Sequence, residues 1–134
     1  MTPQIWLILA CLCVLAAVWL LWSPSTLKTP QERSGRVSYV IDGDTLILAR
    51  TRLKIRLWGV DAPEMDQAGG EASASYLRQI AEGQAIRCQE ITIDRYGRSV
   101  SRCFLSDGRE INRMMIDSPH AKEYRRFTKG FYGR

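Results

Sequence analysis

The stretch RVSYVIDGDTLILAR, residues 36–50, decides the fold class. Residues 36–41 alternate along the chain, Asp42-Gly43-Asp44 follows them, and a second apolar run begins at Thr45. Alternation with a period of two, interrupted by an Asp-Gly turn, is typical of a β-hairpin. The sequence therefore predicts two antiparallel strands, residues 36–41 and 45–50, joined at this turn.

The chain beyond this hairpin predicts three more strands and two short helices. Residues 53–58 (LKIRLW) alternate and form the third strand, and the apolar spacing from Ala72 to Ile80 is helical, with Gly83 as a stop. A second hairpin, residues 85–93 and 98–105, is followed by a short helix over residues 110–117. This order is that of an OB-fold, an α+β architecture with a five-stranded barrel whose face binds oligonucleotides.

The N-terminal segment has a different character. Residues 5–22 are 18 consecutive apolar residues without a charge. A helix of that length spans about 27 Å, close to the roughly 30 Å of a bilayer core. No basic residue precedes the run and no A-x-A site follows it. We expect residues 1–23 to form an uncleaved membrane anchor, with a cleaved secretory signal as the alternative. Residues 24–34 are then a linker and residues 35–134 the folded domain.

The side of the membrane on which the domain lies stays open. Lys28, Arg33 and Arg36 follow the apolar run, and the positive-inside rule then favours the cytoplasm. Cys88 and Cys103 lie on neighbouring predicted strands, and a disulfide between them requires an oxidising compartment. Two buried free thiols are the alternative. We expect a periplasmic or otherwise extracytoplasmic domain, secreted if the segment is cleaved.

The charge distribution points to a polyanionic partner. The chain has a net charge of +5, and from Ser34 onward it has 17 Lys and Arg against 13 Asp and Glu. The excess lies near the C-terminus, where only Glu123 opposes a set of five cations: Lys122, Arg125, Arg126, Lys129 and Arg134. Such a segment attracts nucleic acid or anionic lipid, although many charge clusters are only solvated surface.

Three short motifs carry the candidate chemistry: residues 42–45 (DGDT), 56–64 (RLWGVDAPE) and 94–98 (DRYGR). Asp44 and Asp61 are expected at the ends of neighbouring strands, so two carboxylates can converge on a hard cation. Arg56 and Arg98 can each present a planar guanidinium to a phosphate. Glu64 follows Asp61 by three residues, near enough to act on a water molecule.

Taken in order, these motifs resemble the staphylococcal nuclease family, whose pattern is D-G-D-T, R-L-x-x-V-D-x-P-E and D-x-Y-G-R. The similarity covers residues 36–124. The resemblance implies Ca²⁺ bound by Asp44, Asp61 and the backbone carbonyl of Ala62. It also implies Glu64 as general base, transition-state stabilisation by Arg56 and Arg98, and substrate binding by Arg95 and Tyr96.

The resemblance further implies a monomeric, calcium-dependent nuclease that hydrolyses DNA and RNA with little sequence preference. The best-known members continue into a third helix where this chain ends. We expect four aromatic residues to cover the exposed core edge, with a stacking surface for bases as the alternative: Tyr124, Phe127, Phe131 and Tyr132. That difference keeps open a catalytically silent OB-fold module that binds nucleic acid or a partner at the cell envelope. An accessory role in polysaccharide export or DNA uptake is a third hypothesis.

Overall fold

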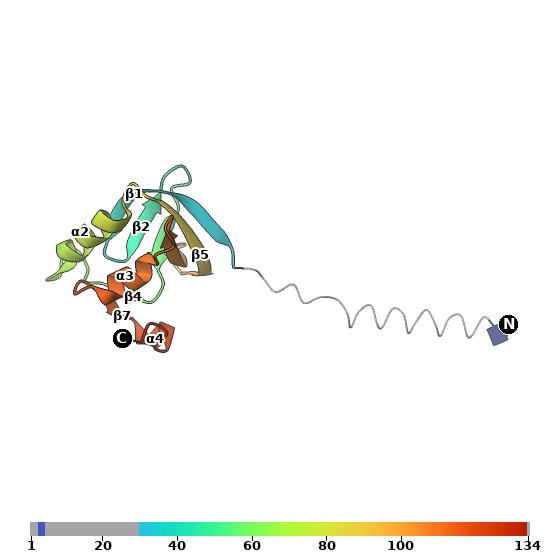
Figure 1. Cartoon of the computed structure of the whole chain (residues 1–134). Coiled ribbons are helices and arrows are strands. Elements are labelled where there is room, and N and C mark those ends of the chain that lie inside the picture. Colours follow the sequence, from blue (N-terminus) through green and yellow to red (C-terminus); the bar gives the residue numbers. More distant parts are fainter. Residues whose placement is uncertain (1–2, 5–29, 134) are drawn as a thin grey trace.

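The computed structural model describes residues 3–4 and 30–133, and residues 32–105 contain a closed five-stranded barrel (Figure 1). Its strand order is β1-β2-β3-β6-β5, with β3 and β6 parallel and the other neighbours antiparallel. The strands are β1 (Glu32–Asp42), β2 (Thr45–Leu48), β3 (Lys54–Leu57), β5 (Ala85–Ile93) and β6 (Ser99–Leu105). The predicted barrel is confirmed, and Asp42 pairs with Thr45 across the predicted turn.

Strand β1 begins at Glu32, four residues before the expected Arg36 and within the expected linker. Residues 32–36 pair with residues 85–89 of β5, and this pairing closes the barrel. A local pattern does not reveal such long-range pairing, so the early start was missed. Among the described residues, no helix has the length and apolar character needed to cross a bilayer. The expected anchor, residues 5–22, lies outside the described residues.

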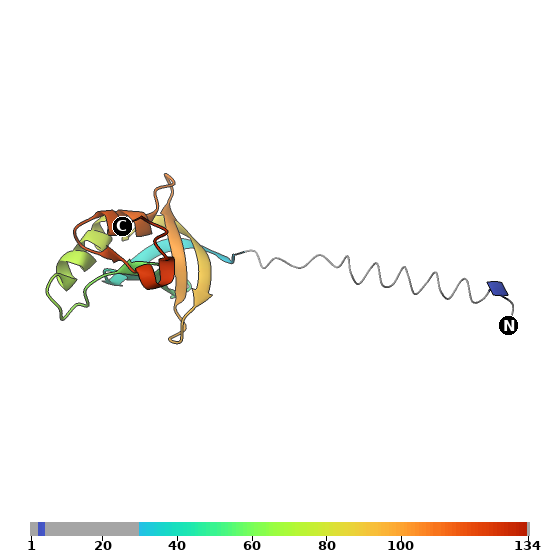
Figure 2. The ribbon, with the colours of Figure 1, turned by 90° about the horizontal axis from the view of Figure 1, so that it is seen from below.

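Helices pack on the barrel at one end (Figures 1 and 2). The two predicted helices are present as α2 (Gly70–Ala81) and α3 (Ile111–Asp117). The prediction of only two helices was wrong. Within residues 30–133, a third helix, α4 (Arg125–Thr128), follows α3. It spans only four residues and buries only Thr128, so it has no apolar period to recognise. Two further short strands, β4 (Val60–Asp61) and β7 (Lys122–Glu123), pair with each other outside the barrel.

The core lies inside the barrel and under α2 and α3. Leu46, Ile55, Leu57, Leu77 and Ile111 are fully buried and belong to one cluster. The buried residues of β3 and β6 occupy alternate positions, and those of α2 share one helical face, as their spacing predicts. In β1 the expected alternation at residues 36–41 is broken by register shifts, and the buried residues Val37 and Val40 are three positions apart. This core fixes the positions of β1, β2, β3 and β6 relative to one another.

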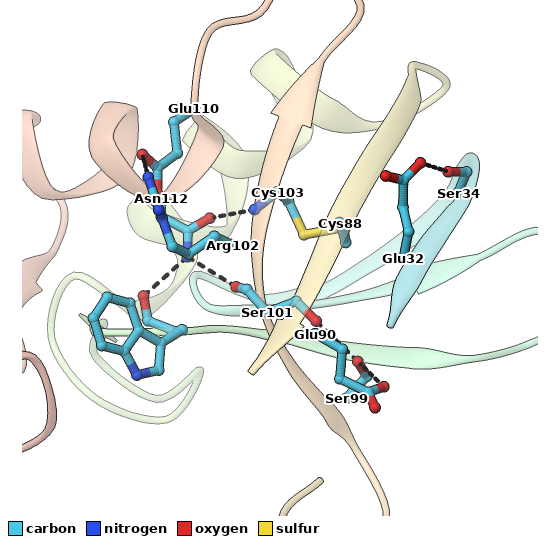
Figure 3. The surroundings of a disulfide bond; sticks show 11 residues. Glu32, Ser34, Cys88, Glu90, Ser99, Ser101, Arg102, Cys103, Glu110 and Asn112 are labelled. Carbon is cyan, nitrogen blue, oxygen red and sulfur yellow. Dashed lines mark hydrogen bonds and ion pairs between the residues drawn. A yellow bond between two sulfur atoms is a disulfide. The ribbon is translucent and has the colours of Figure 1, made fainter. Parts of the chain in front are cut away.

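A disulfide joins Cys88 of β5 to Cys103 of β6 (Figure 3). The two residues are direct cross-strand partners and both side chains are fully buried in the core. The backbone N–H of Cys103 also donates to Asn112 Oδ1 of α3 at 2.9 Å. Of the two possibilities left open by the sequence, the structure contains the disulfide rather than free thiols.

The C-terminal aromatic residues cover the core edge only in part. Tyr132 is buried, and its hydroxyl donates to Glu110 at 2.6 Å, whereas Phe127 and Phe131 are 59% and 53% exposed. Burial alone would raise the pKa of Glu110, but hydrogen bonds from Arg102 and Tyr132 hold it below its ordinary value. The segment after α3 is therefore held by buried Tyr132 and Thr128 and by the pairing of residues 122–123 with β4.

Candidate active site

The β1–β2 turn presents a buried carboxylate to strand β3. Asp44 is 7% exposed, and its Oδ2 accepts a hydrogen bond from Arg56 Nη2 at 3.2 Å. Its Oδ1 accepts one from the Thr45 hydroxyl at 2.8 Å. The turn itself is held by Asp42, whose carboxylate accepts the backbone N–H of Asp44 at 3.0 Å. Because Thr45 and Arg56 are cross-strand partners, the barrel register fixes the Asp44–Arg56 pair.

The environment of Asp44 favours a neighbouring cation. Burial raises the pKa of Asp44 to about 6, an effect that Arg56 counteracts and the Asp42 carboxylate reinforces. One arginine therefore does not fully compensate for the buried negative charge. A carboxylate in this state is stabilised further when a second cation binds beside it.

The β5–β6 hairpin holds a second arginine near the same turn. Arg98 Nε donates to Asp94 Oδ2 at 2.7 Å, and Arg98 Nη1 lies 3.4 Å from the Thr45 hydroxyl. Asp94 Oδ1 accepts the backbone N–H groups of Tyr96 and Arg98. Burial alone would raise the pKa of Asp94, but these hydrogen bonds hold it below its usual value. Asp94 is thus an ionised anchor that fixes the direction of Arg98.

The two predicted substrate-binding residues lie at the tip of this hairpin. Tyr96 is 68% exposed, and its ring centroid is 4.9 Å from the guanidinium carbon of Arg95 and 5.5 Å from that of Arg98. Both distances are within the range of a cation–π contact. The hairpin therefore presents Arg95, Tyr96 and Arg98 together at the surface.

The second motif, residues 56–64, approaches the β1–β2 turn at Val60 and Ala62. Arg56 Nη2 lies 3.4 Å from the carbonyl oxygen of Val60, the residue before Asp61. A methyl group at Gly43 would lie 2.7 Å from Ala62 Cβ and closer still to the Ser73 hydroxyl. The turn that carries Asp44 therefore closes tightly onto Ala62, and only glycine fits there.

Asp61 and Glu64 differ from the other predicted residues. Both side chains are exposed, and in residues 30–133 neither makes a hydrogen bond or an ion pair. The structure joins Asp44 to Arg56 directly and to Arg98 through Thr45, and it places Ala62 against their turn. Asp61 lies at the end of β4 and Glu64 on the loop that follows. The motifs contained Thr45 and Asp94, but we had assigned neither a role. The sequence feature that could have indicated a role for them is a short polar side chain next to a turn.

The residues present fit a calcium ion by the chemistry of their donors. In the described part of the chain, no three carboxylate, imidazole or thiol groups converge. The expected set has only two carboxylates, Asp44 and Asp61, completed by the Ala62 carbonyl. Calcium accepts such mixed oxygen ligands together with water. The close approach of Gly43 to Ala62 brings the two ligand-bearing segments into contact.

Gly43→Ala is expected to destabilise the domain by about 1–3 kcal/mol, because the new methyl group overpacks the contact with Ala62 and Ser73. Thermal unfolding followed by circular dichroism measures the loss. Gly35→Ala is the matched control, since a methyl group there would meet Leu48 at an ordinary 3.5 Å. Equal melting temperatures for the two variants would contradict the tight contact.

The fold and the site together define a class: an OB-type barrel that carries a carboxylate and two arginines at one end. A family model described as "Staphylococcal nuclease homologue" matches residues 54–132. The chain belongs to this family.

Individual relatives agree with this assignment. The chain is 38% identical over 104 residues to "Succinoglycan biosynthesis protein ExoI" of Rhizobium meliloti, covering 69% of this chain and 53% of that protein. It is 33% identical over 96 residues to an "Uncharacterized endonuclease" of Escherichia coli, covering 70% of this chain and 63% of that protein. It is 30% identical over 105 residues to "Micrococcal nuclease" of Shigella flexneri, covering 71% of this chain and 60% of that protein. The chain thus spans between about half and two thirds of these relatives' lengths.

Proposed function

We propose that this protein is a calcium-dependent nuclease that hydrolyses phosphodiester bonds of DNA and RNA with little sequence preference. The observation that carries the proposal is the meeting of Arg56 and Arg98 at the Asp44-Thr45 dipeptide, within 3.4 Å. Two guanidinium groups fixed at one point can bind the anionic oxygens of a phosphodiester, and the family of the chain includes named nucleases.

The arginines are the main source of transition-state stabilisation in this proposal. Attack on a phosphodiester concentrates negative charge on the phosphoryl oxygens, and preorganised cations stabilise that charge most. Arg56 is held by Asp44 and the Val60 carbonyl, and Arg98 is held by Asp94. Each arginine keeps further N–H groups for substrate, because guanidinium has five donors.

Glu64 is proposed as the general base. Its carboxylate is exposed and can accept the proton of an attacking water molecule, provided that substrate binds beside the loop. Asp44, Asp61 and the Ala62 carbonyl are the proposed calcium ligands. The bound ion would polarise the phosphate and orient the water. Arg95 and Tyr96 would contact the substrate from the hairpin tip.

We also propose that residues 5–22 anchor the domain to a membrane, with the domain as an extracytoplasmic monomer. The buried Cys88–Cys103 disulfide supports the compartment, because disulfides persist where the environment is oxidising. If the N-terminal segment is cleaved instead, the same disulfide suits a secreted domain.

The nuclease proposal is tested with the full-length protein in a mild detergent. Single-stranded DNA and RNA should be cleaved in calcium and left intact when a chelator replaces it. Glu64→Gln is expected to lower kcat by about 100-fold, the lower range for loss of a general base, without changing the melting temperature. Asp66→Asn is the matched control, because it makes the same carboxylate-to-amide change at an exposed position of the same loop. A folded protein that leaves both nucleic acids intact in calcium would refute the proposal.

A further inference from the structure

Four exposed cations line the C-terminal segment of the described chain: Lys122, Arg125, Arg126 and Lys129, here termed the cationic strip. They fall within eight consecutive residues of β7 and α4 (Figure 1). Within residues 30–133, none of them forms an ion pair, although arginines elsewhere on the domain do. The strip is therefore a positive surface whose cations are not held in ion pairs within this part of the chain.

The strip starts beside a proposed calcium ligand. Lys122 is the direct cross-strand partner of Asp61 in the β4–β7 pair. Both residues are exposed, whereas the neighbouring partners Val60 and Glu123 are buried. Directly opposed residues of an antiparallel pair project from the same face, with Cβ atoms about 4.5–5.5 Å apart. The Lys122 and Asp61 side chains thus share the solvent face of this two-stranded ribbon.

A cleft of about 350 Å³ lies at this junction. Asp61, Ala62 and Pro63 line one side, and His120 and Lys122 line the other. The cleft therefore connects the segment that carries the proposed calcium ligands to the beginning of the cationic strip. A concave cleft suits a flexible strand better than a flat anionic membrane surface.

We infer that the cleft and the cationic strip form a track for a single-stranded polynucleotide that extends beyond the cleaved bond. This inference rests on the proposed nuclease function and adds a preference for long strands over short ones. Each phosphate neutralised by a lysine or arginine releases counterions, which contributes about 0.7 to the slope of log affinity against log salt for single strands. The strip would bind phosphates regardless of base sequence.

The test compares KM for a dinucleotide with KM for a long single-stranded oligonucleotide. Lys122→Gln/Arg125→Gln/Arg126→Gln in the full-length protein should raise KM for the long substrate by tenfold or more, in rough proportion to three lost phosphate contacts. KM for the dinucleotide should rise much less. The salt slope for the long substrate should fall by about 2.

Two further variants make the test specific. The control variant Arg50→Gln/Arg52→Gln/Lys54→Gln removes the same charge from exposed positions in the β2–β3 connection and at the start of β3. These positions lie at the opposite end of β2 from Asp44, so both KM values should be unchanged. Lys122→Arg/Arg125→Lys/Arg126→Lys keeps the charges and should keep the salt slope. Circular dichroism checks that every variant is folded.

Three results would overturn the inference. One is an equal rise in KM for both substrates, and another is an equal effect of the β2–β3 control variant. The third is an unchanged KM together with lost binding to phosphatidylglycerol vesicles, which would assign the strip to a membrane surface. Failure of the proposed function is distinguishable, because the wild-type protein would then cleave neither substrate.

Discussion

Arg98→Ala is expected to lower kcat on single-stranded DNA by 10²–10³-fold, about 2.7–4 kcal/mol of transition-state stabilisation. The effect should be large because Arg98 is preorganised before substrate binds. Its Nε is held 2.7 Å from Asp94, its backbone N–H donates to the same carboxylate, and its Nη1 lies near Thr45. Single-turnover cleavage in calcium measures the change.

Arg98→Lys should restore little of the lost activity, because an ammonium group cannot contact Asp94 and a phosphate in the same planar arrangement. Arg109→Ala is the matched control. Arg109 makes the same two contacts to Asp107, through its backbone N–H and Nε, on an exposed turn at the other end of β6. An unchanged kcat in Arg98→Ala would remove Arg98 from the active site.

Cys88→Ala/Cys103→Ala is expected to destabilise the domain by about 3 kcal/mol, the loop-closure effect of a disulfide that joins residues 15 apart. For a domain of roughly 100 residues, this corresponds to a fall of about 12–24 °C in Tm. The change is measured by thermal unfolding with and without a reductant. Wild-type protein in reductant should lose nearly as much stability.

Cys88→Val/Cys103→Val separates the cross-link from packing. Both cysteines are fully buried, so valine replaces the lost contacts without restoring the covalent bond. If the cross-link dominates, the valine pair should remain well below wild type. Equal melting temperatures in oxidised and reduced wild-type protein would show that the disulfide contributes no stability.

The same cysteines test the compartment in cells. In a Cys11→Ser/Cys13→Ser background, only Cys88 and Cys103 remain of the four cysteines. Cells are quenched in acid and the precipitated protein is alkylated under denaturing conditions, which expose both buried residues. The protein should remain unmodified if the domain is extracytoplasmic. Alkylation of both cysteines would contradict that proposal.

Several features of this protein could be predicted from the sequence because their signals are local. The alternation in residues 53–58 and the helical spacing at Ala72–Ile80 follow from which side chains face the core, and the structure contains these elements. The strand predicted at residues 36–41 is also present, although register shifts interrupt its alternation. The order of the elements then indicated the barrel, which is confirmed. The three motifs indicated the family, because their spacing matches its pattern.

Other features depended on contacts between distant segments. The early start of β1 comes from pairing with β5, and the short strands β4 and β7 exist only because they pair with each other. Neither they nor α4 has a local period. Thr45 and Asp94 gained roles only when the hairpin brought Arg98 to the β1–β2 turn.

By itself, the sequence determined the elements, their order and the ionisable groups available, since these follow from side-chain type and spacing along one chain. Only the tertiary structure decided which of those groups meet: it joined Asp44 to Arg56, brought Arg98 within reach of Thr45, bonded Cys88 to Cys103 and set Lys122 opposite Asp61. The physical reason is that barrel closure fixes the register between strands, and register is a relation between distant segments that no single segment specifies.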